Sequence, residues 1–335
     1  MFLPFGAECA RARNVPSLVF HGTSFFALCV SESIGFTIEC ARARDDDDNR
    51  PFIVPGLPDS IVLRPSQVPG ASAAPLMKRL RESDALSYGA VFNSFYELEP
   101  AYAEHYRTRL AHRAWHVGPL CLFRADECDE LLLSWLDSKE PGSVVYACFG
   151  SMSRFSRTQL EEITSGLVAS GRHFMWAVRD GEVEEEMLAG HDKGVVARGW
   201  VAQMAILRHP AIGGFVTHCG WNSVIEGLCA GVPLVTWPLF AEQFFNERMV
   251  VDVLRVGVAV GATKWGIEEE EVVAGEALRG AVERVMSEGG EAEGMRGRAR
   301  EIGEAARRAV REGGSSHADL GRLMDELVEV NLKRG

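Results

Sequence analysis

The chain has 335 residues, of which 47 are acidic and 35 basic, so its formal net charge is −12. An acidic excess argues against a binder of nucleic-acid backbones, which needs a basic face, and we expect no nucleic-acid partner. Hydrophobic residues make up 47% of the chain, which excludes wholesale disorder, and the length suggests two domains. No apolar run reaches about 18 residues, so we expect no transmembrane helix.

The eight cysteines are scattered and form no CxxC pair. No HExxH motif or paired Cys/His spacing occurs either, so the sequence predicts neither a disulfide framework nor a metal site. Free thiols are typical of a reducing compartment, and we therefore expect a cytoplasmic protein.

The first part of the chain predicts few regular elements. A stretch with six prolines, 51–75, is expected to be irregular because proline cannot continue a helix. Around it we expect a helix over 4–13, a strand over 17–20, a helix over 76–83, a strand over 89–93 and a helix over 100–112.

From residue 143 onward, apolar strands alternate with helices. We expect strands over 143–149, 173–178, 194–196, 213–217, 232–236 and 257–260. We expect helices over 156–170, 202–207, 222–229, 242–254, 268–286, 291–311 and 315–331. This alternation predicts a parallel sheet covered on both faces, in which ligands bind at loops leaving the carboxyl ends of strands.

The most informative loop, 217–223 (THCGWNS), follows an apolar strand and opens a helix. A helix amino terminus offers unpaired N–H groups and positive charge, which together suit a phosphate. Glu226 lies one turn beyond Asn222, where a carboxylate can accept hydrogen bonds from a ribose diol. Alternatively, Ser223 only caps the helix and His218 is a satisfied core histidine, and the residues alone leave both possibilities open. No GxGxxG or GxxxxGK[ST] motif occurs.

Three other features permit two interpretations each. The loop 149–153 (FGSMS) is either a phosphate-facing loop or a plain turn. Trp200 either stacks on a base or packs in the core. Glu242 and Gln243 either contact sugar hydroxyls or open a helix whose dipole favours an acid at that position.

The 44 residues from Trp200 to Gln243 (WVAQMAILRHPAIGGFVTHCGWNSVIEGLCAGVPLVTWPLFAEQ) resemble the signature box of plant family 1 UDP-dependent glycosyltransferases. Further segments resemble the branch of that family that acts on flavonoids and related metabolites, namely 18–26, 54–58, 93–99, 135–137 and 146–151. The resemblance implies an α/β fold with two facing doubly wound Rossmann-like domains of the GT-B type, the first of them incomplete. It divides the chain into a partial acceptor-side domain (1–122), a linker (123–142), a UDP-sugar donor-binding domain (143–314) and a helix crossing back to the first domain (315–335).

Carried over by position, four residues of the box would hold the nucleoside of the donor. Trp200 would stack on uracil, the Val201 backbone and Gln203 would hold base and ribose, and Glu226 would accept the ribose hydroxyls. The diphosphate would lie between Ser151 and the residues of the 217–223 loop. These loop residues are His218, Gly220, Asn222 and Ser223.

The resemblance also implies that Trp221, Glu242 and Gln243 face the sugar, and that Gln243 favours glucose. The implied reaction is inverting transfer of glucose from UDP-glucose to a hydroxyl of a small lipophilic, flavonoid-like acceptor, with no cofactor or metal. We expect the chain to act as a monomer on these two small-molecule partners.

The catalytic pair of the family is a general-base histidine in an early loop and an aspartate that orients it. This chain starts immediately after the expected place of the aspartate, so no catalytic residue is assigned, and His21 lacks the context to replace the base. The alternative function is a UDP-sugar-binding remnant without catalysis. A nucleotide-dependent oxidoreductase is disfavoured because the glycine fingerprint is missing.

Overall fold

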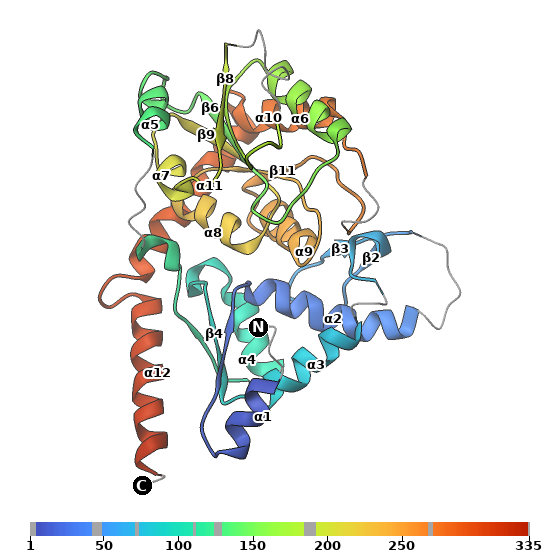
Figure 1. Ribbon diagram of the computed structural model, residues 1–335. Helices are drawn as coiled ribbons and strands as arrows, with labels where there is room; N and C mark the ends of the chain where they lie inside the picture. Colours follow the sequence, from blue (N-terminus) through green and yellow to red (C-terminus); the bar gives the residue numbers. More distant parts are fainter. Residues whose placement is uncertain are drawn as a thin grey trace. The chain divides into compact units, whose positions relative to one another are not determined.

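The computed structural model describes residues 5–41, 49–70, 74–109, 112–123, 129–183, 192–266 and 271–333. The chain forms two compact units: unit 1 comprises Met1–Leu122 and Glu304–Gly335, and unit 2 comprises Phe123–Gly303 (Figure 1). The main sheet of each unit is parallel, which confirms the α/β class predicted from the alternation of strands and helices. None of the helices in the described ranges is long and apolar enough to cross a membrane.

Unit 1 is built on a three-stranded sheet in the order β1-β4-β5 (Leu18–His21, Gly89–Phe92 and Ala114–His116). A separate antiparallel pair joins β2 (Phe52–Ile53) to β3 (Val62–Leu63) inside the proline-dotted stretch. The helices of this unit are α1 (Phe5–Ala12), α2 (Phe25–Ala41), α3 (Ala74–Ala85), α4 (Pro100–Arg109) and α12 (Ser315–Leu332). Short 3₁₀ turns occupy Pro65–Gln67, Tyr96–Leu98 and Leu120–Phe123.

The core of unit 1 is aromatic. Phe25, at the start of α2, stacks on Phe92 of β4 with ring centroids 3.6 Å apart, and Tyr106 of α4 meets both rings edge-on. The buried carboxylate of Glu99 accepts a hydrogen bond from the Phe26 N–H at 2.7 Å. It therefore supplies an acceptor to the amino end of α2, where the N–H groups have no partner within the helix.

Helix α12 is fixed to β5 by the buried carboxylate of Asp319. Asp319 Oδ2 accepts hydrogen bonds from the His116 backbone N–H at 2.9 Å and lies 2.9 Å from His116 Nδ1. Arg322 also pairs with Asp319, and Arg107 approaches it to 3.5 Å. His116 and Asp319 are almost fully enclosed, so this cluster ties the end of the chain to the sheet of unit 1.

Unit 2 contains a six-stranded parallel sheet in the order β11-β10-β9-β6-β7-β8. In chain order the strands are β6 (Val144–Cys148), β7 (His173–Val178), β8 (Gly194–Arg198), β9 (Ile212–Thr217), β10 (Leu234–Thr236) and β11 (Gly257–Ala259). The chain runs outward from β6 to β8 and then returns to place β9, β10 and β11 on the other side of β6. The strand order thus reverses between β6 and β9, and open α/β sheets bind ligands at such a reversal.

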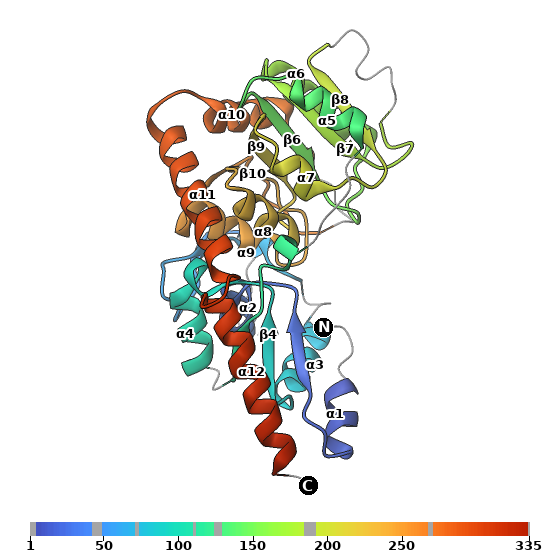
Figure 2. The ribbon, with the colours of Figure 1, turned by 90° about the vertical axis from the view of Figure 1, so that its left-hand side faces the viewer.

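Helices cover both faces of this sheet (Figure 2). Helices α6 and α10 pack together on one face, and α7 and α8 pack together on the other. A Cβ on Gly166 of α6 would lie 2.5 Å from the Gly275 carbonyl oxygen of α10, so the two backbones touch. The helices of unit 2 are α5 (Glu130–Asp137), α6 (Arg157–Ala169), α7 (Gln203–Leu207), α8 (Trp221–Ala230), α9 (Gln243–Arg248) and α10 (Gly275–Met286), and α11 (Gly290–Ala309) begins in unit 2 and ends in unit 1.

Several elements differ from the sequence prediction. Helix α2 and strand β5 were not predicted, and α5 lies within the segment expected as a linker, of which 124–128 fall outside the described residues. The helix expected over 268–286 begins only at Gly275, and 267–270 also fall outside the described residues. The helix expected over 242–254 changes to a π-helical turn at Met249–Val253.

Candidate functional site

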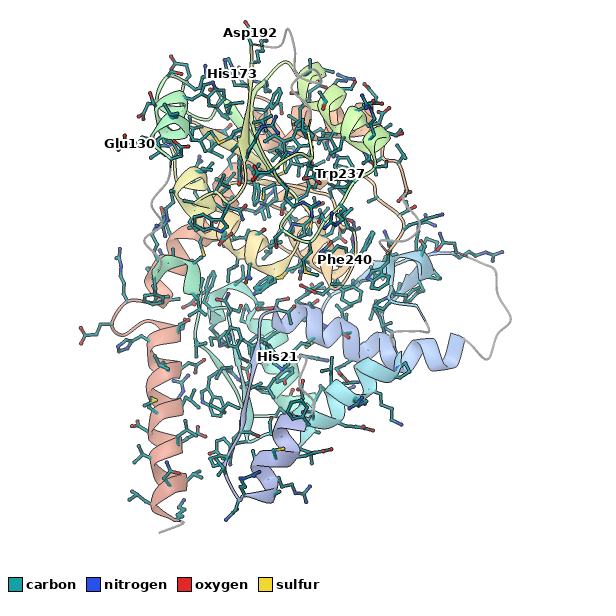
Figure 3. All side chains as sticks on the ribbon, in the orientation of Figure 1. His21, Glu130, His173, Asp192, Trp237 and Phe240 are labelled. Atoms are coloured by element: carbon teal, nitrogen blue, oxygen red, sulfur yellow. The ribbon has the colours of Figure 1, made fainter. Side chains whose placement is uncertain are left out.

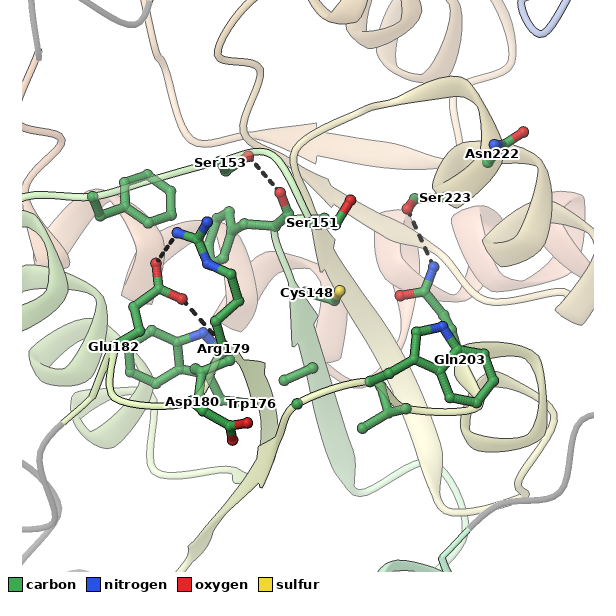
Figure 4. Close-up of a pocket in the computed structure, with 18 of the residues that line it drawn as sticks. Cys148, Ser151, Ser153, Trp176, Arg179, Asp180, Glu182, Gln203, Asn222 and Ser223 are labelled. Carbon is green, nitrogen blue, oxygen red and sulfur yellow. Dashed lines mark hydrogen bonds and ion pairs between the residues drawn. The ribbon is translucent and has the colours of Figure 1, made fainter.

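A cavity of about 590 Å³ lies at the carboxyl end of the unit 2 sheet. Its walls come from the loops after β6, β7 and β8 and from the first turns of α8, which follows β9. These are the loops at the reversal of strand order. Of the twelve residues predicted from sequence, the cavity brings together seven (Figure 4): Ser151, Trp200, Val201, Gln203, Asn222, Ser223 and Glu226.

His218 and Gly220 do not line this cavity, but the His218 ring lies against Gly150, which does, and two glycines make room for it. A Cβ on Gly150 would lie 2.7 Å from His218 Cε1, and a Cβ on Gly220 would lie 2.5 Å from His218 Nε2. Both distances are too short for any side chain. Gly150 also has φ = +75°, a conformation that only glycine adopts readily. His218 is therefore held between the loop after β6 and the loop after β9.

The amino end of α8 borders the cavity, because Asn222 and Ser223 of its first turn line it. Its N-cap residue is Gly220, and no side chain caps it. Asn222 and Ser223 lie inside the first turn, so the alternative that Ser223 caps the helix is wrong. The N–H groups of this turn have no partner within the helix and carry the positive end of its dipole, which suits an anion.

The backbone just before α8 is strained. Cys219 is fully buried and has φ = +65°, an unusual conformation for a residue with a Cβ. Asn246 Nδ2 donates a 2.9 Å hydrogen bond to the Cys219 carbonyl oxygen, which fixes this turn from α9. Strain of this kind is found where a loop is held in one shape for binding.

Gln203 and Glu226 form a polar pair on one wall. Gln203 Nε2 donates to Glu226 Oε2 at 2.6 Å and to Ser223 Oγ at 3.2 Å, while Tyr146 donates its hydroxyl to Gln203 Oε1 at 3.2 Å. Figure 4 shows the Gln203–Ser223 bond on one side of the cavity. The bonds orient the Glu226 carboxylate before any ligand arrives, and a carboxylate has room for further donors on its two oxygens.

Trp200 lies at the rim with its indole 72% exposed, although tryptophan is usually well buried. It follows Gly199, which has φ = +75°, directly after β8. The ring is not core, so of the two interpretations of Trp200 the core one is wrong. An exposed, flat aromatic face beside a polar cavity can stack on a base or another planar group.

His218 is neutral at physiological pH because burial lowers its pKa to about 4. A neutral imidazole can donate one hydrogen bond and accept another, but it contributes no positive charge. The positive potential at this end of the sheet therefore comes from the α8 amino end rather than from a histidine cation.

The remaining predicted residues, Trp221, Glu242 and Gln243, do not line this cavity. The Trp221 side chain is only 2% exposed. Gln243 Oε1 accepts the Leu239 N–H at 2.8 Å and the Phe240 N–H at 3.0 Å, so only its amide NH₂ is left for a ligand. Burial raises the pKa of Glu242.

The sequence analysis did not include three charged residues that line the cavity after β7: Arg179, Asp180 and Glu182. Arg179 Nη2 donates to Glu182 Oε1 at 2.9 Å, on the side of the cavity opposite Gln203 (Figure 4). The strand over 173–178 was predicted, and loops at carboxyl ends of strands carry the ligand contacts. Applied to the loop after this strand, that rule would have predicted these three residues.

His21, at the end of β1 in unit 1, lies in the interior of that unit (Figure 3). It is 2% exposed, its Nε2 is 3.4 Å from Asp84 Oδ2, and its ring lies 4.9 Å from the Phe92 ring. Burial lowers its pKa to about 4. These surroundings agree with leaving His21 without a catalytic role.

Residues 99–289 match the family model described as UDP-glucoronosyl and UDP-glucosyl transferase. Scopoletin glucosyltransferase of Nicotiana tabacum is 46% identical, over 98% of this chain and 73% of its own length. UDP-glucose flavonoid 3-O-glucosyltransferase 7 of Fragaria ananassa is 45% identical, over 98% of this chain and 74% of its own length.

The crystal structure of Glycyrrhiza uralensis UGT73P12, complexed with glycyrrhetinic acid 3-O-monoglucuronide, is similar with a TM-score of 0.92. Its sequence is 38% identical, and the match covers 99% of this chain and 73% of that one. These matches confirm the GT-B type of α/β fold and the resemblance found in the 200–243 box. The chain therefore belongs to the plant family 1 UDP-glycosyltransferases, hexosyltransferases that glycosylate small molecules.

Proposed function

We propose that this chain takes part in the transfer of glucose from UDP-glucose to a hydroxyl group of a small lipophilic, flavonoid-like plant metabolite. The observation that carries the proposal is the amino end of α8, whose first turn lines a cavity with an exposed indole and an oriented carboxylate. The names of the relatives from Nicotiana and Fragaria, both glucosyltransferases, support glucose as the sugar.

In this proposal the nucleoside binds between Trp200 and Glu226. Uracil stacks on the indole, a contact worth about 1–3 kcal/mol for a base on an aromatic ring, and the Val201 backbone meets its edge. The ribose hydroxyls donate to the Glu226 carboxylate. Gln203, which is already bonded to Glu226, holds the acceptor oxygens in place, so less ordering is needed when the ligand binds.

The diphosphate binds at the amino end of α8, where the first-turn N–H groups and the Asn222 and Ser223 side chains donate to it. Ser151 donates from the loop after β6. His218 donates one N–H as a neutral imidazole, because its folded-state pKa is about 4. The helix supplies the positive potential, equivalent to about half an elementary charge.

The reaction is a displacement at the anomeric carbon. The acceptor oxygen forms a bond to that carbon, the bond to the UDP oxygen breaks, and its electron pair leaves on the β-phosphate. Donors aimed at the phosphate bind the developing charge more strongly than the ground state and so lower the barrier. The sugar hydroxyls contact Glu242 and the free NH₂ of Gln243. The acceptor proton passes to a general base that we assign to no residue of this chain.

Titration calorimetry with UDP-glucose tests the donor half of the proposal. Glu226→Ala removes a charge-assisted hydrogen-bond acceptor and should weaken binding by about 1–3 kcal/mol. Glu226→Gln, which keeps the shape, should also weaken it. Glu161→Ala is the control, since Glu161 is an exposed acid on α6 that pairs with Arg157. An unchanged affinity of the Glu226 variants would place the ribose elsewhere.

The transfer half is tested separately with UDP-glucose and a panel of flavonols, by mass spectrometry of the products. A glucosylated product whose yield falls in the Glu226 variants supports the proposal. Tight UDP-glucose binding without any product would instead support the non-catalytic alternative for this chain.

A further inference from the structure

A second large cavity, of about 650 Å³, lies in unit 2 at the amino end of the same sheet. Residues at the start of four strands line this cavity. Ser143, Arg172 and Pro233 immediately precede β6, β7 and β10, and Ile212 begins β9. The proposed donor cavity lies at the carboxyl ends of these strands. A strand of five or six residues separates the two ends by about 15–20 Å, so the two cavities are distinct.

The lining of this second cavity is strongly basic. Four arginines contribute to it, against a single carboxylate, Glu288. The arginines come from three places in the sequence and are Arg172, Arg208, Arg296 and Arg300. This concentration of positive charge stands out in a chain whose net charge is −12, and we call the cavity the arginine groove.

Three of the four guanidinium groups are left without a partner in the part of the chain that the structure describes. Arg296 donates to the carbonyl oxygens of Val285 and Ser287 at 3.1 and 3.0 Å, at the carboxyl end of α10. His209, also in the lining, pairs with Asp137 at 3.0 Å. The guanidinium groups of Arg172, Arg208 and Arg300 make no hydrogen bond or ion pair to another residue of the described ranges; Arg172 bonds only through its backbone N–H, to Ser170 Oγ at 3.3 Å.

The carboxyl ends of α6, α7 and α8 also point toward this edge, and arginines often balance the negative potential there. This balancing of negative potential accounts for Arg296, which donates to carbonyl oxygens at the carboxyl end of a helix. It does not explain the other three, whose guanidinium groups bond to no carbonyl oxygen of the described residues. Each of them has five N–H donors available to a ligand.

We propose that the arginine groove binds a small polyanion that carries two or more phosphate or carboxylate groups. The planar fork of a guanidinium matches both groups in a bidentate manner. A volume of about 650 Å³ lies within the range of small-molecule sites, about 300–1,000 Å³. Three unpaired cations around one cavity favour a ligand with several negative charges over a single one.

The test is calorimetric titration of the protein with inorganic tripolyphosphate in the presence of saturating uridine, which occupies the nucleoside part of the proposed donor site and carries no phosphate to compete for the groove. We expect one tripolyphosphate per chain, with an affinity that falls as the salt concentration rises. Citrate in the same titration distinguishes carboxylate from phosphate recognition, and binding of either polyanion supports the proposal.

Arg208→Gln and Arg300→Gln change exposed residues, and each should weaken this binding about tenfold, as expected for one lost charge-assisted hydrogen-bond pair. Both variants should bind UDP as the unchanged protein does. Arg157→Gln is the matched control, because Arg157 lies at the opposite end of α6 and pairs with Glu161. It should have no effect on either ligand.

Two results would overturn the proposal. One is that neither tripolyphosphate nor citrate binds the uridine-saturated protein at physiological salt. The other is that a polyanion binds with an affinity that Arg208→Gln and Arg300→Gln leave unchanged. A failure of UDP itself to bind would contradict the proposed function and not the groove, because the two titrations are read separately.

Discussion

His116 in unit 1 and His218 in unit 2 both lie at the carboxyl end of a parallel strand, β5 and β9. Burial lowers the pKa of both rings. His116 is fully enclosed and paired with Asp319. His218 has no hydrogen bond to the described residues and lies between two glycines, one of which lines a cavity. Residue type and position in the fold are alike, so only the partners separate a structural histidine from one available to a ligand.

Removing the partner of His116 should have the largest effect on stability. Asp319→Ala removes a buried carboxylate and leaves two His116 N–H groups without an acceptor, at a cost of about 1–3 kcal/mol for each unsatisfied donor. We expect this loss in the denaturant-induced unfolding of unit 1, with UDP affinity unchanged. Asp325→Ala, an exposed acid on the same helix, is the control. A loss below about 1 kcal/mol at Asp319 would show that the pair is not structural.

Closing the space around His218 should have the next largest effect, on binding. In Gly150→Ala the new methyl group meets the imidazole at 2.7 Å, so either the ring or the loop must move, and we expect UDP affinity to fall about 100-fold, as for a misplaced binding group. Gly171→Ala controls for backbone strain, because Gly171 has φ = +67° and no atom within 4 Å of its Cβ position. If both variants lose UDP affinity equally, the space that Gly150 leaves for the His218 ring has no specific role in binding UDP.

Exchanging each histidine for glutamine compares the two sites directly. His218→Gln loses the imidazole donor, and we expect about tenfold weaker UDP binding, the usual cost of one hydrogen bond to a charged group. His116→Gln should leave UDP affinity within the error of the titration. If His116→Gln weakens UDP as much as His218→Gln does, the distinction between the two rings is wrong.

The smallest expected effect is on the pH dependence of stability. The folded-state pKa of His218 is about 4, below the ordinary value of 6.5, so the unfolded chain binds the proton first as the pH falls. The neutral ring thus contributes stability that is present above pH 6.5 and is lost between 6.5 and 4. Over that window His218→Gln should lose less unfolding free energy than the unchanged protein. If the unfolding free energies of the two proteins fall in parallel between pH 6.5 and 4, the lowered pKa of His218 is contradicted.

The strands of unit 2 were predictable because each is a continuous apolar run bounded by turn residues. The strand over 173–178 agrees with β7 (His173–Val178), and the helix expected over 156–170 agrees with α6, which Ser156 caps by accepting the Gln159 N–H. Helix α2 was missed because its sequence, FFALCVSESIGFTIECA, is apolar with little periodicity. A helix that is apolar on every side gives no amphipathic signal. Strand β5 has only three residues, too few for a pattern.

The site was predictable where loops follow recognisable strands, as for Ser151, Asn222 and Glu226. The role of the backbone at the site could not be predicted from the sequence. The space around the His218 ring depends on the close approach of Gly150 and Gly220, which are 70 positions apart in the sequence. The arginine groove likewise joins residues from three segments, and no local motif marks it. The neutral state of His218 follows from burial, which the sequence does not contain.

A crystal structure of this protein with UDP tests the central claim most directly. The account predicts uracil stacked on Trp200, the ribose hydroxyls on Glu226, and the diphosphate between Ser151 and the amino end of α8. UDP bound with its diphosphate in the arginine groove, or with its base away from Trp200, would contradict it.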